Sequence, residues 1–293
     1  MGRRRNSEFA LLVAFSSAFW WTPLATTFRL AWTNEAYTHI ILILPLSLAL
    51  IYFESKTLQP AIVPSRLGGV FLFVMSLALA YFARSSGAFP PDVQLTLSML
   101  AVVVWWVACV VFCFGLHVFR AFLFPLCFLF WLVPLPNFLL NWIIAALQNG
   151  SAAMARWLFL WARVPVTLNG VTLSLPRLDI EVARECSSIR SSMVLIVTTM
   201  VLAHLFLKSP WRKALVVLFA IPLTAAKNAL RIFVIVALAT RVDPAYLDGN
   251  LHHRGGIVFL MVALAVTGTL LWLLARSEAG SKSKLAADRV RNP

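Results

Sequence analysis

The sequence predicts an all-α polytopic membrane protein with about eight transmembrane helices, an interfacial helix and a small extracytoplasmic β-hairpin. Hydrophobic residues make up 61% of the 293 residues and charged residues only 12%, which is the composition of a chain that lies mostly in lipid. The net charge of +14 would favour nucleic acid as the partner of a soluble protein. Here the basic residues lie mostly at the ends of apolar runs, so they indicate membrane topology and contact with lipid headgroups.

Eight apolar segments approach the roughly 20 residues that cross a bilayer as a helix. They cover residues 8–28, 36–53, 67–84, 93–115, 118–134, 187–207, 211–241 and 251–275. The fifth segment is short, contains Pro125 and ends in VPLPN, and we expect a kink or turn there because proline interrupts helical hydrogen bonding. The N-terminal MGRRR is typical of a signal peptide, but no small-residue cleavage site follows it, so we expect the first segment to be a retained helix.

A further apolar segment, residues 138–162, is expected to lie in the interface on the outer face of the membrane. Polar residues from Gln148 to Ser151 and Arg156 interrupt its apolar run, and its tryptophans suit the headgroup level. If the N-terminus is cytoplasmic, eight crossings return the C-terminus to the cytoplasm. The Lys and Arg residues then fall mostly on inner loops, as the positive-inside bias predicts. If this segment crosses the bilayer instead, every later element is inverted.

The chain shows no internal repeat and no separate soluble domain. We expect a single integral-membrane domain over residues 1–275. Residues 276–293 lack apolar periodicity and are rich in basic residues, so we expect a disordered cytoplasmic tail that touches lipid.

A β-hairpin is predicted in the polar stretch before the segment 187–207. Residues 166–175, VTLNGVTLSL, alternate β-branched and other side chains around Asn169-Gly170. Asn-Gly between two such runs is a strong indicator of a two-residue hairpin turn.

Three chemically complementary residue types are predicted to lie at one membrane depth on three consecutive helices. Cys186 stands at the outer start of the segment 187–207, and His252 and His253 stand at the outer start of the last segment. Arg231 lies about twenty residues after Trp211, which at about 1.5 Å per residue places it close to the outer surface.

Cysteine, histidine and arginine together are suited to acyl transfer. The thiolate of cysteine is a nucleophile, and a neighbouring cation favours that form. Histidine exchanges protons near neutral pH, and arginine is a fixed positive donor toward an oxyanion. The other cysteines, Cys109, Cys113 and Cys127, lie inside apolar runs without accompanying His or carboxylates, so we expect packing and no metal site.

The polar neighbours of these residues leave alternatives open. Arg190 lies one helical turn after Cys186, and three roles are open for it. It holds the thiolate, it anchors the carboxylate of Glu185 or Asp179, or it forms a salt bridge that only stabilises the start of the segment 187–207. Asn228 positions Arg231, binds substrate backbone, or makes a structural hydrogen bond between helices. We expect Lys227 to snorkel to the surface and not to be catalytic.

Three segments resemble the exosortase and archaeosortase family of membrane cysteine transpeptidases: ECSSIRSS (185–192), PLTAAKNALRIF (222–233) and LHHRGGIVFL (251–260). The resemblance covers roughly residues 120–275. It makes Cys186 the nucleophile, Arg231 of the Asn-x-x-Arg motif the catalytic arginine, and His252 the histidine, because Gly256 follows four residues later. The adjacent His253 stays an alternative.

The resemblance also concerns the surrounding positions. One departure is Ser188, where glycine is commoner in the family. Glu185, Ser187, Arg190 and Asn228 are the candidate supporting or substrate-binding residues.

The resemblance implies a bacterial inner-membrane cysteine endopeptidase or transpeptidase with its active site at the extracytoplasmic face. Its substrates would be exported proteins with a C-terminal sorting signal of a short motif, a transmembrane helix and a basic cluster. A thioester on Cys186 would pass to an amine, a lipid-linked acceptor or water. Membrane lipids are expected partners, and no cofactor, metal or nucleic acid is expected.

Two other function classes fit the same hydropathy. Intramembrane Lys227, Asn228 and Arg231 would suit a non-catalytic transporter or a scaffold for exopolysaccharide assembly or export, although the chain lacks the repeated halves that transporters usually show. A lipid-linked sugar transferase usually needs clustered acidic residues in its loops, and the acids do not cluster here.

Overall fold

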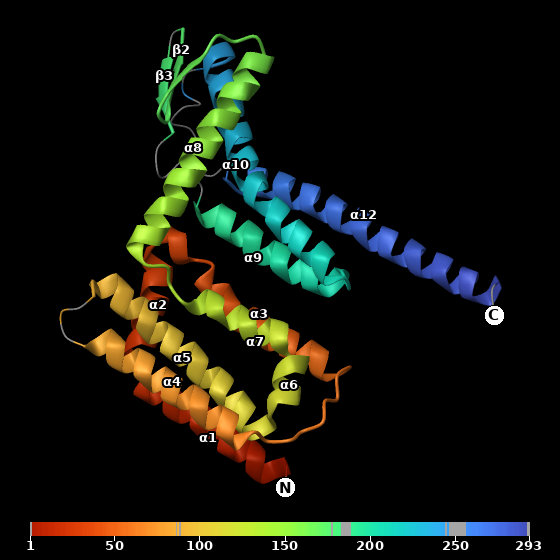
Figure 1. Ribbon diagram of the computed structural model, residues 1–293. Helices are drawn as coiled ribbons and strands as arrows, with labels where there is room; N and C mark the ends of the chain where they lie inside the picture. The colour runs from red at the N-terminus through yellow and green to blue at the C-terminus, as the bar shows by residue number, and fades with distance from the viewer. Residues whose placement is uncertain are drawn as a thin grey trace. The chain divides into compact units, whose positions relative to one another are not determined.

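The structure is a computed structural model, and it describes residues 2–85, 87, 89–176, 178–182, 189–243, 245 and 256–291. Six of the described helices are long and apolar enough to cross a membrane, and up to eight spans result if two broken helix pairs each count as one. This confirms the predicted all-α polytopic class. The chain divides into two units, Met1–Leu140 and Asn141–Pro293, and Figure 1 shows the elements of each.

The first unit consists of helices only, in the part that the structure describes. Its elements are α1 (Gly2–Phe19), α2 (Trp21–Thr33), η1 (Glu35–Tyr37), α3 (Ile40–Ser55), α4 (Arg66–Arg84), α5 (Pro91–Phe114), α6 (Leu116–Ala121), α7 (Leu123–Phe128) and η2 (Leu129–Leu132).

The first predicted span, residues 8–28, is not one continuous helix, and this expectation was wrong. It divides at Trp20 into α1 and α2, which are bent by 72° relative to one another. Pro23 lies in the first turn of α2. Proline has no backbone N–H and its ring clashes with the carbonyl four residues earlier, here that of Phe19, so the helix cannot continue straight through.

Helices α4 and α5 lie side by side along their length (Figure 1). A Cβ on Gly69 would lie 2.5 Å from Cβ of Phe112, so only glycine permits this approach of the two backbones. The buried Ser76 hydroxyl donates to the carbonyl of Ala101 over 2.7 Å, which satisfies a polar group within the pair.

The interruption expected at Pro125 is confirmed, because the fifth span consists of the short pieces α6, α7 and η2. The proline-containing stretch after η2 is held by side chains from elsewhere in the unit. The hydroxyl of Tyr37 donates to the carbonyl of Leu135 over 2.8 Å, and that of Thr96 to the carbonyl of Pro134 over 2.9 Å.

The second unit combines helices with a small sheet. Its elements are α8 (Asn137–Trp161), which begins at the end of the first unit, β1 (Thr167–Asn169), β2 (Thr172–Leu175), β3 (Leu178–Glu181), α9 (Ile189–Phe206), α10 (Pro210–Arg241) and α12 (Gly256–Arg291). The segment 138–162 is helical as predicted, and its interfacial position stays a prediction. Helix α12 continues past residue 275 as far as Arg291, and the domain division expected at residue 275 also stays a prediction.

The predicted hairpin is confirmed, with two differences. Asn169 pairs with Thr172, so the two-residue loop is Gly170-Val171 and not Asn169-Gly170. Gly170 has φ 61°, and a type II′ turn requires positive φ at its first central position, which glycine adopts without strain. A third antiparallel strand, β3, extends the sheet in the order β1-β2-β3.

The core of the second unit joins α8, α10 and the sheet. Small and apolar residues at spacings of three and four face one another: Ala152, Ala155 and Phe159 from α8, and Ala229, Ile232 and Val236 from α10, with Val166, Leu173 and Val182 from the sheet region. Such spacing places the residues on one face of each helix. This core fixes the turn of α10 that carries Arg231.

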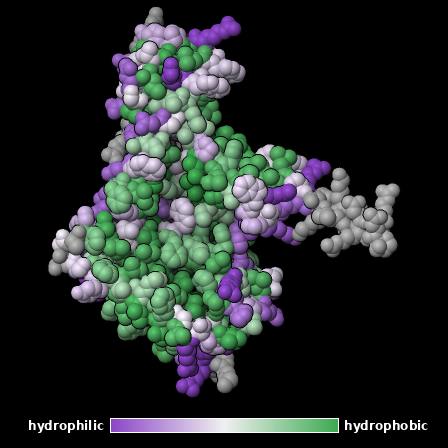
Figure 2. Space-filling view, in the orientation of Figure 1, coloured by the Kyte–Doolittle hydropathy of each residue, from purple (hydrophilic) through white to green (hydrophobic). Residues whose placement is uncertain are grey.

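Apolar side chains cover much of the face seen in Figure 2. Among the exposed apolar side chains of α4, that of Leu67 is 86% exposed and that of Phe71 is 67% exposed. In a water-soluble protein such residues would be buried, so this surface is suited to contact with lipid.

Candidate active site

The structure describes three of the predicted site residues. Arg231 and Asn228 lie on α10, and Arg190 lies in the first turn of α9 with an exposed side chain. The other predicted site residues lie outside the described residues: Cys186, Glu185, Ser187, His252 and His253.

One turn of α10 buries three polar side chains. The exposed fractions are 5% for Lys227, 1% for Asn228 and 9% for Arg231. Residues three and four apart are neighbours on a helix surface, so these three groups cover adjoining faces of the same turn. Polar groups at membrane depth are costly unless they find partners in the protein interior.

Asn228 binds α8. Its Nδ2 donates to Oγ of Ser151, which is fully buried, over 3.1 Å. This is the interhelical hydrogen bond that the sequence left as one alternative for Asn228. Close to it, a Cβ on Gly150 would lie 3.5 Å from Cβ of Ala225, so small residues bring α8 and α10 together at this level.

Lys227 binds α9 and does not snorkel to the surface, so that expectation was wrong. Its Nζ donates to Oγ of Ser191. The contact is possible because Lys227 faces the neighbouring helix, where the serine hydroxyl supplies an acceptor for the ammonium. Since Ser191 is five positions after Cys186 in the sequence, the contact joins the first turn of α9 to the turn of α10 that carries Arg231.

The chain that approaches Cys186 from the sheet is also anchored. Gln148 on α8 donates from Nε2 to the carbonyl of Val182 over 2.9 Å, and Val182 is 1% exposed. Gln148 and Ser151 are three residues apart and therefore share one face of α8. This face holds both the chain before Cys186 and the helix that carries Arg231.

Sequence reasoning missed these anchors, Gln148, Ser151 and Ser191. Each of them became recognisable only through its partner in the folded unit. The run SAAMA at residues 151–155 was the one available indication, because small residues in a helix of membrane proteins mark close packing.

Two cationic side chains on adjoining faces of a buried turn create a positive environment. Arginine keeps its charge in any protein environment. Positive groups held in a low-dielectric site stabilise a thiolate or an oxyanion more than they would in water. Among the described residues, no group of three His, Cys, Asp or Glu side chains is placed to hold a metal ion.

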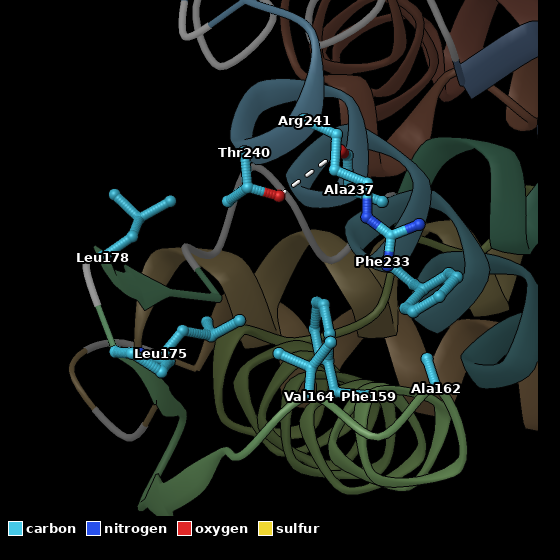
Figure 3. Close-up of a pocket in the computed structure, with 10 residues that line it drawn as sticks. Phe159, Ala162, Val164, Leu175, Leu178, Phe233, Ala237, Thr240 and Arg241 are labelled. Carbon is cyan, nitrogen blue, oxygen red and sulfur yellow. Dashed lines mark hydrogen bonds between the residues drawn. The ribbon is translucent and has the colours of Figure 1, made fainter.

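An apolar pocket lies further along α10, beyond Arg231 (Figure 3). Its volume is about 320 Å³, and its walls come from the end of α8, the sheet and α10: Phe159, Ala162, Val164, Leu175, Pro176, Leu178, Phe233, Ala237, Thr240 and Arg241. The sequence did not predict it, because its walls come together only in the folded unit.

A comparison with known protein families shows to which family the chain belongs. The family model described as transmembrane exosortase matches residues 31–269. The chain belongs to the exosortase family. The match includes all three motif segments, 185–192, 222–233 and 251–260, and extends into the first unit, well before residue 120 where the motif resemblance begins. Comparisons with curated proteins and with solved structures give no match.

Membership in the exosortase family supports a membrane transpeptidase-like or protease-like role in general terms, and a multi-pass membrane location. The resemblance recognised in the three motifs is therefore confirmed.

Proposed function

We propose that this exosortase is a membrane-embedded cysteine endopeptidase and transpeptidase that processes C-terminal sorting signals of exported proteins. The observation that carries the proposal is the anchoring of α10 beside the start of α9. Lys227 contacts Ser191 just after the Cys186 segment, and Arg231 is buried one turn further along α10. A nucleophile and a fixed cation from different helices require such a rigid connection.

In the proposed reaction, the Cys186 thiolate attacks the carbonyl carbon of the scissile bond. The carbonyl oxygen becomes an oxyanion, which the Arg231 guanidinium stabilises. When the carbon–nitrogen bond breaks, His252, or His253, donates a proton to the departing amine. The product is a thioester on Cys186, and an amine, a lipid-linked acceptor or water then displaces the thiol.

The proposed substrate is an exported protein anchored by a C-terminal transmembrane helix. That helix would lie beside the bundle with its basic cluster in the cytoplasm, and its short motif would reach the outer surface. Arg190, Glu185 and Ser187 are the proposed supporting or substrate-binding residues around the nucleophile, and Asn228 is proposed to keep the α10 turn in place through Ser151. The proposed location is the bacterial inner membrane, with the site facing outward.

The alternative of a transporter or polysaccharide scaffold has less support. Its sequence argument was that Lys227, Asn228 and Arg231 would line a path. Lys227 and Asn228 instead bind the hydroxyls of Ser191 and Ser151, and both are nearly fully buried. Such contacts favour closely packed helices that support a catalytic site over helices that line an open transport path.

The test follows a tagged exported protein, with a motif, apolar helix and basic tail, by immunoblot in the native host. Cys186→Ala is expected to abolish the size shift of the substrate, whereas Cys127→Ala, at an exposed cysteine of α7, is expected to keep it. Normal processing by Cys186→Ala at equal expression would overturn the mechanism. Separate His252→Ala and His253→Ala variants identify the proton donor, and mass spectrometry of the new C-terminus distinguishes transfer from hydrolysis.

A further inference from the structure

The apolar pocket beside the end of α10 has the size of a small ligand site. Small-molecule sites in proteins usually enclose about 300–1,000 Å³, and this pocket has about 320 Å³. In Figure 3 the rings of Phe159 and Phe233 lie on one side of the pocket, and Leu175 of the sheet points toward Phe159 from the other side. The two rings also contact one another, with centroids 5.1 Å apart.

Two independent features of the helices indicate that the pocket lies at the level of a membrane interface. Helix α10 has 32 residues and at 1.5 Å per residue is about 48 Å long, while a bilayer with its headgroups is about 40–45 Å thick. With the exposed Trp211 at one interface, Arg241 reaches the headgroups of the opposite leaflet. Trp157 and Trp161, at the pocket end of α8, are 65% and 78% exposed, as in an aromatic belt.

The opening of the pocket carries positive charge. Arg241 lines it, and in Figure 3 its side chain extends along the pocket toward Phe233. On β3, Leu178 lines the pocket, so the next residue, Asp179, points to the other face of the strand. The carboxylate of Asp243 accepts a hydrogen bond from the backbone N–H of Ala245 over 2.8 Å. No described acidic side chain forms an ion pair with Arg241.

An apolar cavity with one cation at its rim, at headgroup depth, matches one kind of molecule. We propose that this pocket binds an anionic phospholipid of the surrounding membrane, with an acyl chain between the sheet and the two phenylalanine rings and the phosphate on Arg241. Arginine suits this task because its guanidinium forms paired hydrogen bonds with phosphate oxygens. The bound lipid would join the sheet to α8 and α10, and the proposal does not depend on the catalytic role of Cys186.

The test uses the purified full-length protein in detergent and native mass spectrometry, with phosphatidylglycerol and phosphatidylcholine of identical acyl chains as probes. The wild-type protein is expected to retain one phosphatidylglycerol in preference to phosphatidylcholine. A basic residue near a membrane surface contributes about 1 kcal/mol, so Arg241→Gln is expected to weaken phosphatidylglycerol retention about fivefold. Arg156→Gln removes the same charge from an exposed α8 residue that does not line the pocket, and it is expected to leave retention unchanged.

A second variant tests the acyl-chain part of the proposal. Ala237→Phe places a ring into the cavity, and it is expected to abolish retention and the rise in melting temperature that phosphatidylglycerol produces in the wild-type protein. Since Arg241 is exposed, its variant is expected to fold even if Ala237→Phe does not.

Three results would overturn the proposal. Equal retention of the two lipids by the wild-type protein would exclude recognition of the anionic headgroup. Equal weakening by Arg241→Gln and Arg156→Gln would indicate diffuse surface charge. A folded Ala237→Phe protein that retains lipid but no longer processes substrate would assign the pocket to the polypeptide substrate.

Discussion

The hydrogen bond between Lys227 and Ser191 gives a sharp test of how α9 and α10 are joined. Ser191→Ala removes the hydroxyl that accepts a hydrogen bond from Lys227. The ammonium of Lys227, which belongs to a residue only 5% exposed, then loses this bond. Hydrogen bonds to charged groups contribute about 1.5–3 kcal/mol in soluble proteins, and interhelical ones in membrane proteins at most about 1.7 kcal/mol. We therefore expect Ser191→Ala to lower the free energy of unfolding by about 1.5 kcal/mol, roughly a tenfold change in the folded-to-unfolded ratio.

The assay is a double-mutant cycle, with unfolding of the detergent-solubilised protein followed by far-UV circular dichroism. In the Lys227→Met background no ammonium is left unpaired, so Ser191→Ala is expected to cost about 1 kcal/mol less there than in the wild-type background. Ser192→Ala is the matched control, because the Ser192 hydroxyl is buried and has no hydrogen-bond partner among the described residues. This substitution is expected to be neutral or stabilising. An equal cost of Ser191→Ala in both backgrounds would refute the reasoning.

Three further predictions concern the scaffold. Thermal unfolding monitored by tryptophan fluorescence checks the first and the third, and the yield of folded protein checks the second. Arg163 lies two residues after the end of α8 and has φ 59°. The N–H of Val164 donates to the carbonyl of Phe159 and that of Arg163 to the carbonyl of Leu160, a helix end that favours glycine at this position. Arg163→Gly is therefore expected to stabilise the protein by about 0.5–1 kcal/mol, and a lower melting temperature would contradict this. A Cβ on Gly115, which has φ 92°, would lie 1.7 Å from the carbonyl oxygen of Val63, so Gly115→Ala is expected to prevent folding of the first unit. Gly268 has open space around it, so Gly268→Ala is expected to be tolerated. Equal yields of the two variants would refute the clash. Glu278 accepts hydrogen bonds from the backbone N–H groups of Lys208 and Ser209, each over 3.0 Å. Glu278→Gln is expected to lower the free energy of unfolding by about 1 kcal/mol, because charge-assisted bonds at the start of α10 become neutral ones. An unchanged melting temperature would show that the charge of Glu278 contributes nothing to stability.

The sequence by itself determined the membrane class, most of the helices and the family. Apolar length is a local property, so runs such as 93–115 and 211–241 identify α5 and α10 within a few residues. The motif segments 185–192, 222–233 and 251–260 identified the family in the same way, because residue type and spacing need no knowledge of the fold. The Asn-Gly dipeptide located the hairpin, although Gly170 occupies the first turn position and not the second.

Two structural features had a cause in the local sequence, but an interpretation based on hydropathy did not predict them. The division of the first span follows from Pro23 and its clash with the carbonyl of Phe19. The third strand, β3, has the sequence LDIE, whose alternation of apolar and acidic residues fits a strand with one buried face. Four residues are too few to distinguish a strand from a loop before the partner strand is known.

Only the tertiary structure decided which polar groups are paired and where space remains. Helical spacing places Lys227 and Asn228 on adjoining faces of one helix, but it does not say that Ser191 and Ser151 stand opposite them. The pocket near Arg241 likewise needs walls from α8, the sheet and α10 at once. The physical reason is the same in both cases: hydropathy and motifs are properties of one segment, whereas a hydrogen bond or a cavity exists only between segments that folding has brought together.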